Sequence, residues 1–109
     1  MHSTLTVIYT SRLEECRAFY AGLGLDLRPE RHGTGPDHFA AVLDDGAVFE
    51  LYPAGAREPT GRVRLGFAAE SGTTGLDPGR HLLHDPDGRA VEMTVKEAGV
   101  TPGTDPRRG

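Results

Sequence analysis

The sequence predicts an α+β domain built from two β-α-β-β-β modules, of which the second is shortened. The stretches DDGAVFEL and DPDGRAVEM (85–93) both place an Asp-Gly turn before a strand that carries a glutamate among apolar residues. The stretches LTVIYT (5–10) and VRLGFAA (63–69) are two similar opening strands. Only the first copy has a helical pattern between its opening strand and its hairpin. These observations together indicate a duplication with one helix missing.

A single helix is expected after the opening strand. Ser11 and Glu14 have the spacing of a capping box, in which two side chains satisfy the free amides at a helix start. Gly24 stands where a glycine commonly follows the last helical residue. Apolar residues recur at helical spacing between these ends, at Leu13, Cys16, Phe19, Tyr20 and Leu23. We expect Cys16 to be a small buried hydrophobe on the helix face toward the sheet.

Three further strands complete the first module, which is expected to span residues 4–53. Residues 25–30 (LDLRPE) predict an edge strand, because Pro29 lacks the amide hydrogen that a central strand needs. The stretches HFAAVLDD and AVFELYP predict two strands joined by a tight turn at Asp44-Asp45-Gly46.

The second module is expected at residues 63–95, between a linker at 54–62 and a polar tail at 96–109. Only ESGTTGLDPG lies between its opening strand and its hairpin, and this segment is too rich in glycine and proline for a helix. We therefore expect the second module to lack its helix and its edge strand. We expect residues 1–109 to form a single domain.

Composition excludes several classes of function. The net charge of −4 argues against non-specific nucleic-acid binding, which needs a basic surface. No apolar run approaches the roughly 20 residues of a membrane span, so no membrane partner is expected. One cysteine cannot form an intrachain disulfide, and we expect a cytoplasmic protein.

Two motifs carry a resemblance to a known family. The helix segment SRLEECRAFYAGLGL and the last-hairpin segment DPDGRAVEM resemble those of the vicinal oxygen chelate superfamily. That superfamily holds glyoxalases, extradiol dioxygenases, fosfomycin-modifying enzymes and bleomycin-type resistance proteins. The resemblance covers about residues 5–95. It implies that both modules form one cup-shaped mixed sheet, with the first and last strand of each module forming the inner wall.

Metal-dependent members of that family place one ligand, typically His or Glu, on each of these four strands. The resemblance puts Leu5, Glu50, Arg64 and Glu92 at these positions. Two carboxylates beside a guanidinium fall short of the three or so protein ligands that a catalytic metal needs, so we expect no metal and no other cofactor. The alternative is one divalent metal ion. Without metal, we expect Arg64 to bridge the two glutamates, although either glutamate remains a candidate general base.

The other side chains of the predicted ligand site are mostly apolar. Val7, Tyr9 and Tyr52 share the inward side of their strands with Leu5 and Glu50. His38 starts an inner strand and is expected to be a partly exposed residue at the rim. The remaining histidines are not expected to help, since they lie near a terminus, in a loop, or on opposite sides of one strand: His2, His32, His81 and His84.

The missing helix predicts a partner. The apolar residues that would pack beneath it are Leu65, Phe67, Val91, Met93 and Val95. Left bare, they would form a patch larger than monomers usually expose. We therefore expect a symmetric homodimer that covers this patch.

These observations favour a metal-free protein that binds a small molecule, sequestering a hydrophobic or cationic drug-like ligand as antibiotic-resistance members of the family do. The alternative is a glyoxalase-like enzyme, either a metal-dependent lyase or dioxygenase, or a metal-free isomerase with Glu50 or Glu92 as base. A third possibility is a vestigial cup in a protein that serves only through its dimer surface.

Overall fold

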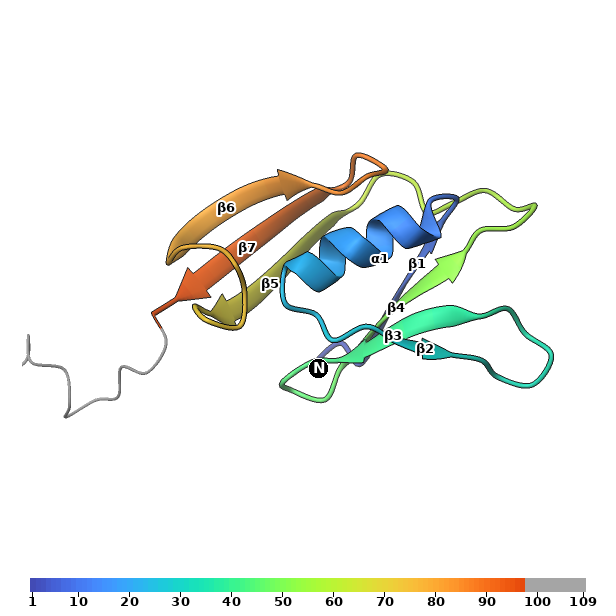
Figure 1. The fold of residues 1–109 in the computed structure, drawn as a ribbon, viewed down its shortest axis with the longest axis horizontal. Helices are drawn as coiled ribbons and strands as arrows, with labels where there is room; N and C mark the ends of the chain where they lie inside the picture. The colour runs from blue at the N-terminus through green and yellow to red at the C-terminus, as the bar shows by residue number, and fades with distance from the viewer. Residues whose placement is uncertain (98–109) are drawn as a thin grey trace, which may run out of the picture.

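The structure is a computed structural model that describes residues 1–97. Its elements are β1 (Leu5–Thr10), α1 (Leu13–Gly22), β2 (Arg28–Glu30), β3 (His38–Val42), β4 (Val48–Pro53), β5 (Arg64–Glu70), β6 (Gly79–His84) and β7 (Ala90–Lys96). They form two sheets with the strand orders β1-β4-β3-β2 and β5-β7-β6 (Figure 1). The polar tail predicted at 96–109 lies outside the described residues from position 98 onward.

The two sheets repeat one pattern of strand pairing. The opening strand of each sheet runs parallel to its last strand, β1 beside β4 and β5 beside β7, and the remaining pairs are antiparallel. The expected mixed pairing is therefore present in both halves. The sheets are separate in the described chain, however, and do not form the one continuous cup-shaped sheet that the resemblance implied.

The ends of α1 differ in how well the sequence predicts them. The helix begins at Leu13 after Arg12, without a side-chain cap, so the predicted capping box at Ser11 is wrong. The hydroxyl of Thr10 accepts the amide of Arg12 at 2.9 Å instead. The prediction for Gly24 is confirmed, because its φ of 113° is one that residues with a side chain rarely adopt.

The predicted turn between β3 and β4 is also confirmed. Gly46 has a φ of 88°, and its amide donates to the carbonyl of Leu43 at 2.9 Å. Pro29 lies in β2, the strand at the edge of its sheet, as expected for a residue without an amide hydrogen.

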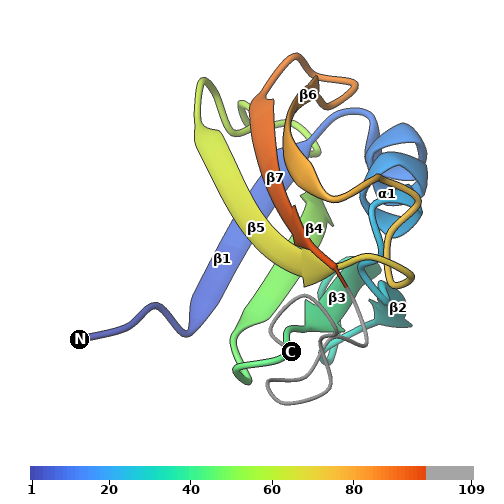
Figure 2. The same cartoon turned by 90° about the vertical axis from the view of Figure 1, so that its left-hand side faces the viewer.

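One hydrophobic core serves both sheets. Helix α1 lies on the same side of the two sheets (Figure 2), and its Tyr20 is fully buried. The ring of Phe49 on β4 lies 5.1 Å from that of Tyr20 and 5.5 Å from that of Phe67 on β5. Buried Val91 and Met93 of β7 belong to the same cluster.

The expectation of a bare apolar face on the second sheet is therefore wrong. Val95 is only 4% exposed, and Leu65 packs against the shared core. The physical reason is that α1 of the first half, together with the first sheet, covers the face that a second helix would otherwise cover. A second subunit is not needed there.

Within residues 1–97, no helix combines the length and the apolar character that crossing a membrane requires.

Candidate functional site

The positions expected to form the inner wall are divided between the two sheets. Glu50 lies on β4, whereas Arg64 and Glu92 lie on β5 and β7. Glu50 Oε2 lies 3.5 Å from His38 Nε2, and Glu92 Oε2 lies 3.6 Å from Arg64 Nη2. The other carboxylate oxygen of Glu92 pairs with Arg80. The two glutamates therefore have separate partners, and only the Arg64–Glu92 half of the expected bridge forms.

The first sheet has one face that does not pack against α1. Strand register places Val7 beside Glu50 and Tyr9 beside Tyr52, with Leu5 one step further along β1 on the same face. We call this surface the open face. The opposite side of these strands belongs to the core. Leu5 is 54% exposed and Tyr9 is 46% exposed, so the open face meets solvent in a single chain.

The open face carries a pair of aromatic rings next to a carboxylate. The centroids of Tyr9 and Tyr52 lie 5.7 Å apart, with their planes tilted by 46°. Desolvation and then the nearby charge of Glu50 raise the pKa of Tyr52 above its ordinary value. Its phenol therefore remains a hydrogen-bond donor at neutral pH, beside a group that accepts hydrogen bonds.

His38 lies at the start of β3 on the rim of the open face. Its side chain is 1% exposed, so the expectation of a partly exposed residue is wrong. The ring stacks on Tyr52 with centroids 4.0 Å apart and planes at 11°, and the ring of His32 covers it from another side at 5.0 Å. These two rings exclude water from His38.

Two carboxylates and a second histidine converge on this ring. His38 Nε2 lies 3.2 Å from Glu30 Oε1, and His32 Nε2 lies 3.2 Å from the same oxygen. With Glu50, the four residues each offer one ligand atom, and these atoms all lie within 4.8 Å of one another. Nitrogen and oxygen donors in such a group suit a divalent transition-metal ion.

Glu30 and His32 were not predicted from the sequence to belong to a site. Glu30 was part of a predicted edge strand and His32 part of the following loop. The register of the strands places Glu30 next to His38, because Glu30 on β2 pairs with His38 on β3, and His32 follows two residues after Glu30. One signal was available in the sequence. Glu30 and His32 form the pattern E-x-H, and a third potential metal ligand, His38, follows six residues after His32.

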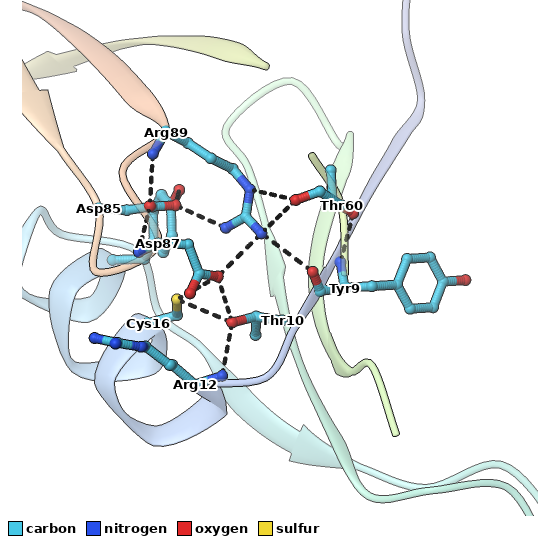
Figure 3. A network of polar contacts seen from close by, with 9 residues as sticks. Tyr9, Thr10, Arg12, Cys16, Thr60, Asp85, Asp87 and Arg89 are labelled. Atoms are coloured by element: carbon cyan, nitrogen blue, oxygen red, sulfur yellow. Dashed lines mark hydrogen bonds and ion pairs between the residues drawn. The ribbon is translucent and has the colours of Figure 1, made fainter. Parts of the chain in front are cut away.

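The DPDGR turn (residues 85–89) joins the second half of the chain to the first (Figure 3). The guanidinium of Arg89 donates to Asp85 at 2.9 Å and to the backbone carbonyls of Tyr9 at 3.1 Å and Thr60 at 2.9 Å. It also lies 3.0 Å from the carboxylate of Asp87, which accepts the hydroxyl of Thr10. The turn thereby fastens the end of β1 and the linker to the second sheet.

Asp85 is the centre of this network. It accepts the Tyr20 hydroxyl at 2.7 Å and the backbone amides of Asp87 and Arg89 at 2.9 Å each. Burial alone would raise the pKa of this carboxyl, but the hydrogen bonds from Tyr20 and Arg89 outweigh burial and hold the pKa of Asp85 below its usual value. The second acidic turn is therefore a structural joint, a role that the sequence analysis did not assign to it.

A separate hollow lies between the end of α1, the β3–β4 turn and β5. Its volume is about 560 Å³. Phe67 and Met93 line its apolar part, and Asp44 and Asp45 lie at its acidic part. Val42 at the end of β3 also lines this hollow, whose other lining residues lie outside β1 and β4.

Comparisons with known proteins place the fold. No protein-family model matches the chain, and no curated protein matches it in sequence. Among solved structures it is similar to the oxidase ChaP-H2, with 12% identity, a TM-score of 0.61, and coverage of 91% of this chain and 96% of the other. It is similar to TnmS3, an antibiotic binding protein from Streptomyces sp. CB03234, with 18% identity, a TM-score of 0.58, and coverage of 89% and 97%.

A third similar structure is a lactoylglutathione lyase from Agrobacterium tumefaciens, with 13% identity, a TM-score of 0.55, and coverage of 86% of this chain and 92% of that one. These neighbours span binding and enzymatic proteins, so they identify an architecture and not an activity. The repeated strand pairing and the similarity to these solved structures agree. The chain has the fold of the vicinal oxygen chelate superfamily.

Proposed function

We propose that this protein binds and sequesters a hydrophobic or cationic organic small molecule on the open face. The observation that carries this proposal is where the exposed apolar side chains lie. Among the described residues, the large exposed hydrophobic side chains other than Met1 are Leu5 and Tyr9 on β1, Val42 on β3 and Leu82 on β6. Val42 pairs with Val48 of β4, which places it on the open face with Leu5 and Tyr9. Apolar surface gathered in this way is typical of ligand and partner sites.

The chemistry of the open face suits a flat ligand. The rings of Tyr9 and Tyr52 offer stacking area, and the Glu50 carboxylate beside them favours a positive charge on the ligand. Leu5 and Arg64 offer no metal ligand, so the proposed binding relies on the aromatic rings and the carboxylate of the open face. The likeness to TnmS3, described as an antibiotic binding protein, supports a sequestering role.

We propose further that a second copy of the chain supplies the opposite wall. Within residues 1–97 both sheets turn their core faces to α1, so the second sheet does not lie over the open face of its own chain. Leu82, 59% exposed, pairs with Glu92 on the equivalent face of the second sheet and offers an apolar contact. A symmetric homodimer in which each copy apposes its second sheet to its partner's open face would enclose two sites.

Light scattering at micromolar concentration tests the dimer. Wild-type protein is expected to have twice the chain mass, and Leu82→Lys is expected to shift it toward one chain mass. A wild-type monomer at these concentrations contradicts the second-copy wall, while leaving ligand binding to the open face to be measured separately.

Fluorescence titration with a cationic acridine dye and a neutral polycyclic hydrocarbon tests the ligand proposal. Tyr9→Ala is expected to weaken both ligands by about tenfold, the equivalent of roughly 1.4 kcal/mol for one lost aromatic contact. Glu50→Gln is expected to weaken the cationic dye alone, and Glu58→Gln, a change in the exposed linker, is expected to weaken neither.

The two surfaces of the chain give distinguishable results. If the double variant Asp44→Asn/Asp45→Asn abolishes binding while Tyr9→Ala leaves it intact, the ligand occupies the hollow beside β5 and not the open face. If neither probe class binds at micromolar concentration, the sequestering function is refuted.

A further inference from the structure

We propose that Glu30, His32, His38 and Glu50 form a binding site for one divalent transition-metal ion such as Zn²⁺. Only Glu50 belongs to the four expected inner-wall positions, Leu5, Glu50, Arg64 and Glu92. The other three residues come from β2, the loop that follows it and the start of β3. The site thus lies at the rim of the open face, and it stands independently of whether the open face binds an organic ligand.

His38 presents its Nε2 atom to two carboxylates. His38 Nδ1 lies 3.2 Å from the carbonyl oxygen of Pro36, which can only accept, so this nitrogen must carry the hydrogen. A neutral His38 then has a bare Nε2. That bare nitrogen lies 3.2 Å from Glu30 Oε1 and 3.5 Å from Glu50 Oε2, which are also acceptors. A metal ion bound between these three atoms would stabilise their close approach, because each can offer it a lone pair.

His32 adds a fourth ligand atom to the group. Its Nε2 lies 3.2 Å from the Glu30 oxygen that His38 contacts. Two imidazoles and two carboxylates are a ligand set that zinc and its neighbours prefer. Two neutral histidines and two carboxylates also balance the charge of a divalent ion.

The spacing of the donors fits such an ion. Ligand atoms about 2.1 Å from a tetrahedral metal lie about 3.4 Å from one another. Three donor pairs are separated by 3.2, 3.2 and 3.5 Å, and all four atoms lie within 4.8 Å. The pairs that involve His32 can shorten when this residue, which is 70% exposed and sits in a loop, moves toward the ion, and the Glu30–Glu50 pair can shorten through the flexible, partly exposed Glu30 side chain.

The surroundings supply what a metal site needs beyond its ligands. The contact of His38 Nδ1 with the Pro36 carbonyl fixes the tautomer that leaves Nε2 free for metal. The stacked ring of Tyr52 shields one side of His38. Glu30 is 42% exposed, so an ion can enter from solvent on the other side.

The test uses untagged, full-length protein stripped of metal with a chelator. Isothermal titration with Zn²⁺ is expected to give one equivalent per chain, and elemental analysis after desalting is expected to find the same ratio. Co²⁺ added in place of Zn²⁺ is expected to give the intense visible absorption of a four-coordinate ion.

Substitutions at the proposed ligands test where the ion binds. Glu30→Gln and His32→Gln change side chains that are 42% and 70% exposed, and each is expected to lower Zn²⁺ affinity at least about tenfold. His38→Gln is expected to lower it further, and its fold is checked by circular dichroism. His84→Gln, an exposed histidine outside the cluster, is the matched control and is expected to bind like wild type.

Two results overturn the proposal. The first is the absence of saturable binding by wild-type protein, which would mean that the four side chains pair with one another and hold no metal. The second is binding that His84→Gln weakens as much as His32→Gln does, which would mean that scattered surface histidines hold the metal.

Discussion

Replacing Asp85 by asparagine tests the joint between the two halves of the chain. The carboxylate accepts hydrogen bonds from the Tyr20 hydroxyl, two backbone amides and the guanidinium of Arg89. Asparagine keeps one oxygen for the amides but turns an NH₂ group toward Arg89, which is itself a donor. The side chains of Asp85 and Arg89 are 0% and 2% exposed, so water cannot replace the lost partner.

Breaking a buried ion pair from one side costs about 3–5 kcal/mol. Asp87 still lies 3.0 Å from Arg89 in the variant, so we expect a loss of about 3 kcal/mol. Small domains have total stabilities of about 5–15 kcal/mol, so this change removes a large fraction. Asp44→Asn, at the exposed turn of the first half, is the control and is expected to stay within about 0.5 kcal/mol of wild type.

Urea unfolding followed by far-ultraviolet circular dichroism at pH 7 measures the effect. With a denaturant slope of about 1.5 kcal/mol/M, the midpoint for Asp85→Asn should fall by about 2 M. A loss below about 1 kcal/mol would refute the reasoning, because the buried pair would then contribute no more than an ordinary surface contact.

Three further outcomes follow from the same structure. The pKa of Asp85 is lower in the folded than in the unfolded chain, so its contribution is complete above about pH 3.9 and lost as pH falls below it; the urea stabilities of wild type and Asp85→Asn should therefore converge in acid. Gly24→Ala places a methyl group against the Thr73 carbonyl at a positive φ and should cost at least about 2 kcal/mol in urea unfolding, unlike Gly61→Ala, which meets open space. Burial raises the pKa of Cys16, so a thiol reagent should react with it at the rate of unfolding, and fast reaction in native protein would contradict its burial.

The sequence predicted what depends on neighbouring residues. The helix that ends before Gly24 and the turn at Gly46 follow from local conformational preference, and alternation along the strands correctly separated the side of Glu50 from the side of Phe49. The start of α1 is the exception. Thr10, the last residue of β1, accepts the amide of Arg12, so no capping box forms.

What the sequence did not predict depends on contacts between distant segments. Alternation identified the apolar face of β7, but only the packed structure shows that Tyr20 and Phe49 of the first half cover it. The Asp85 network is similar, because its partner Tyr20 lies 65 residues away. The acidic turn was read as a local feature, whereas its composition is explained by a long-range joint.

The histidine cluster was missed for the same reason. A buried position for His38 requires knowing that Tyr52 stacks on it and that β2 pairs with β3 so that Glu30 faces it. Pairing register between strands is a property of the assembled sheet. One sequence offers Glu30 and His32 as polar residues near a loop and gives no reason to join them to Glu50.

The sharing of α1 between two sheets bears on how the chain is made. During synthesis the first half leaves the ribosome before the strands that complete its core, so a nascent chain that ends before β7 leaves Phe49 and the helix with only some of their apolar neighbours. A chain stalled near residue 85 would expose apolar core residues and would be prone to aggregate. The β5–β7 segment alone would lack the Tyr20 and Phe49 side chains that complete its core. We therefore expect the two halves to fold together in one cooperative step.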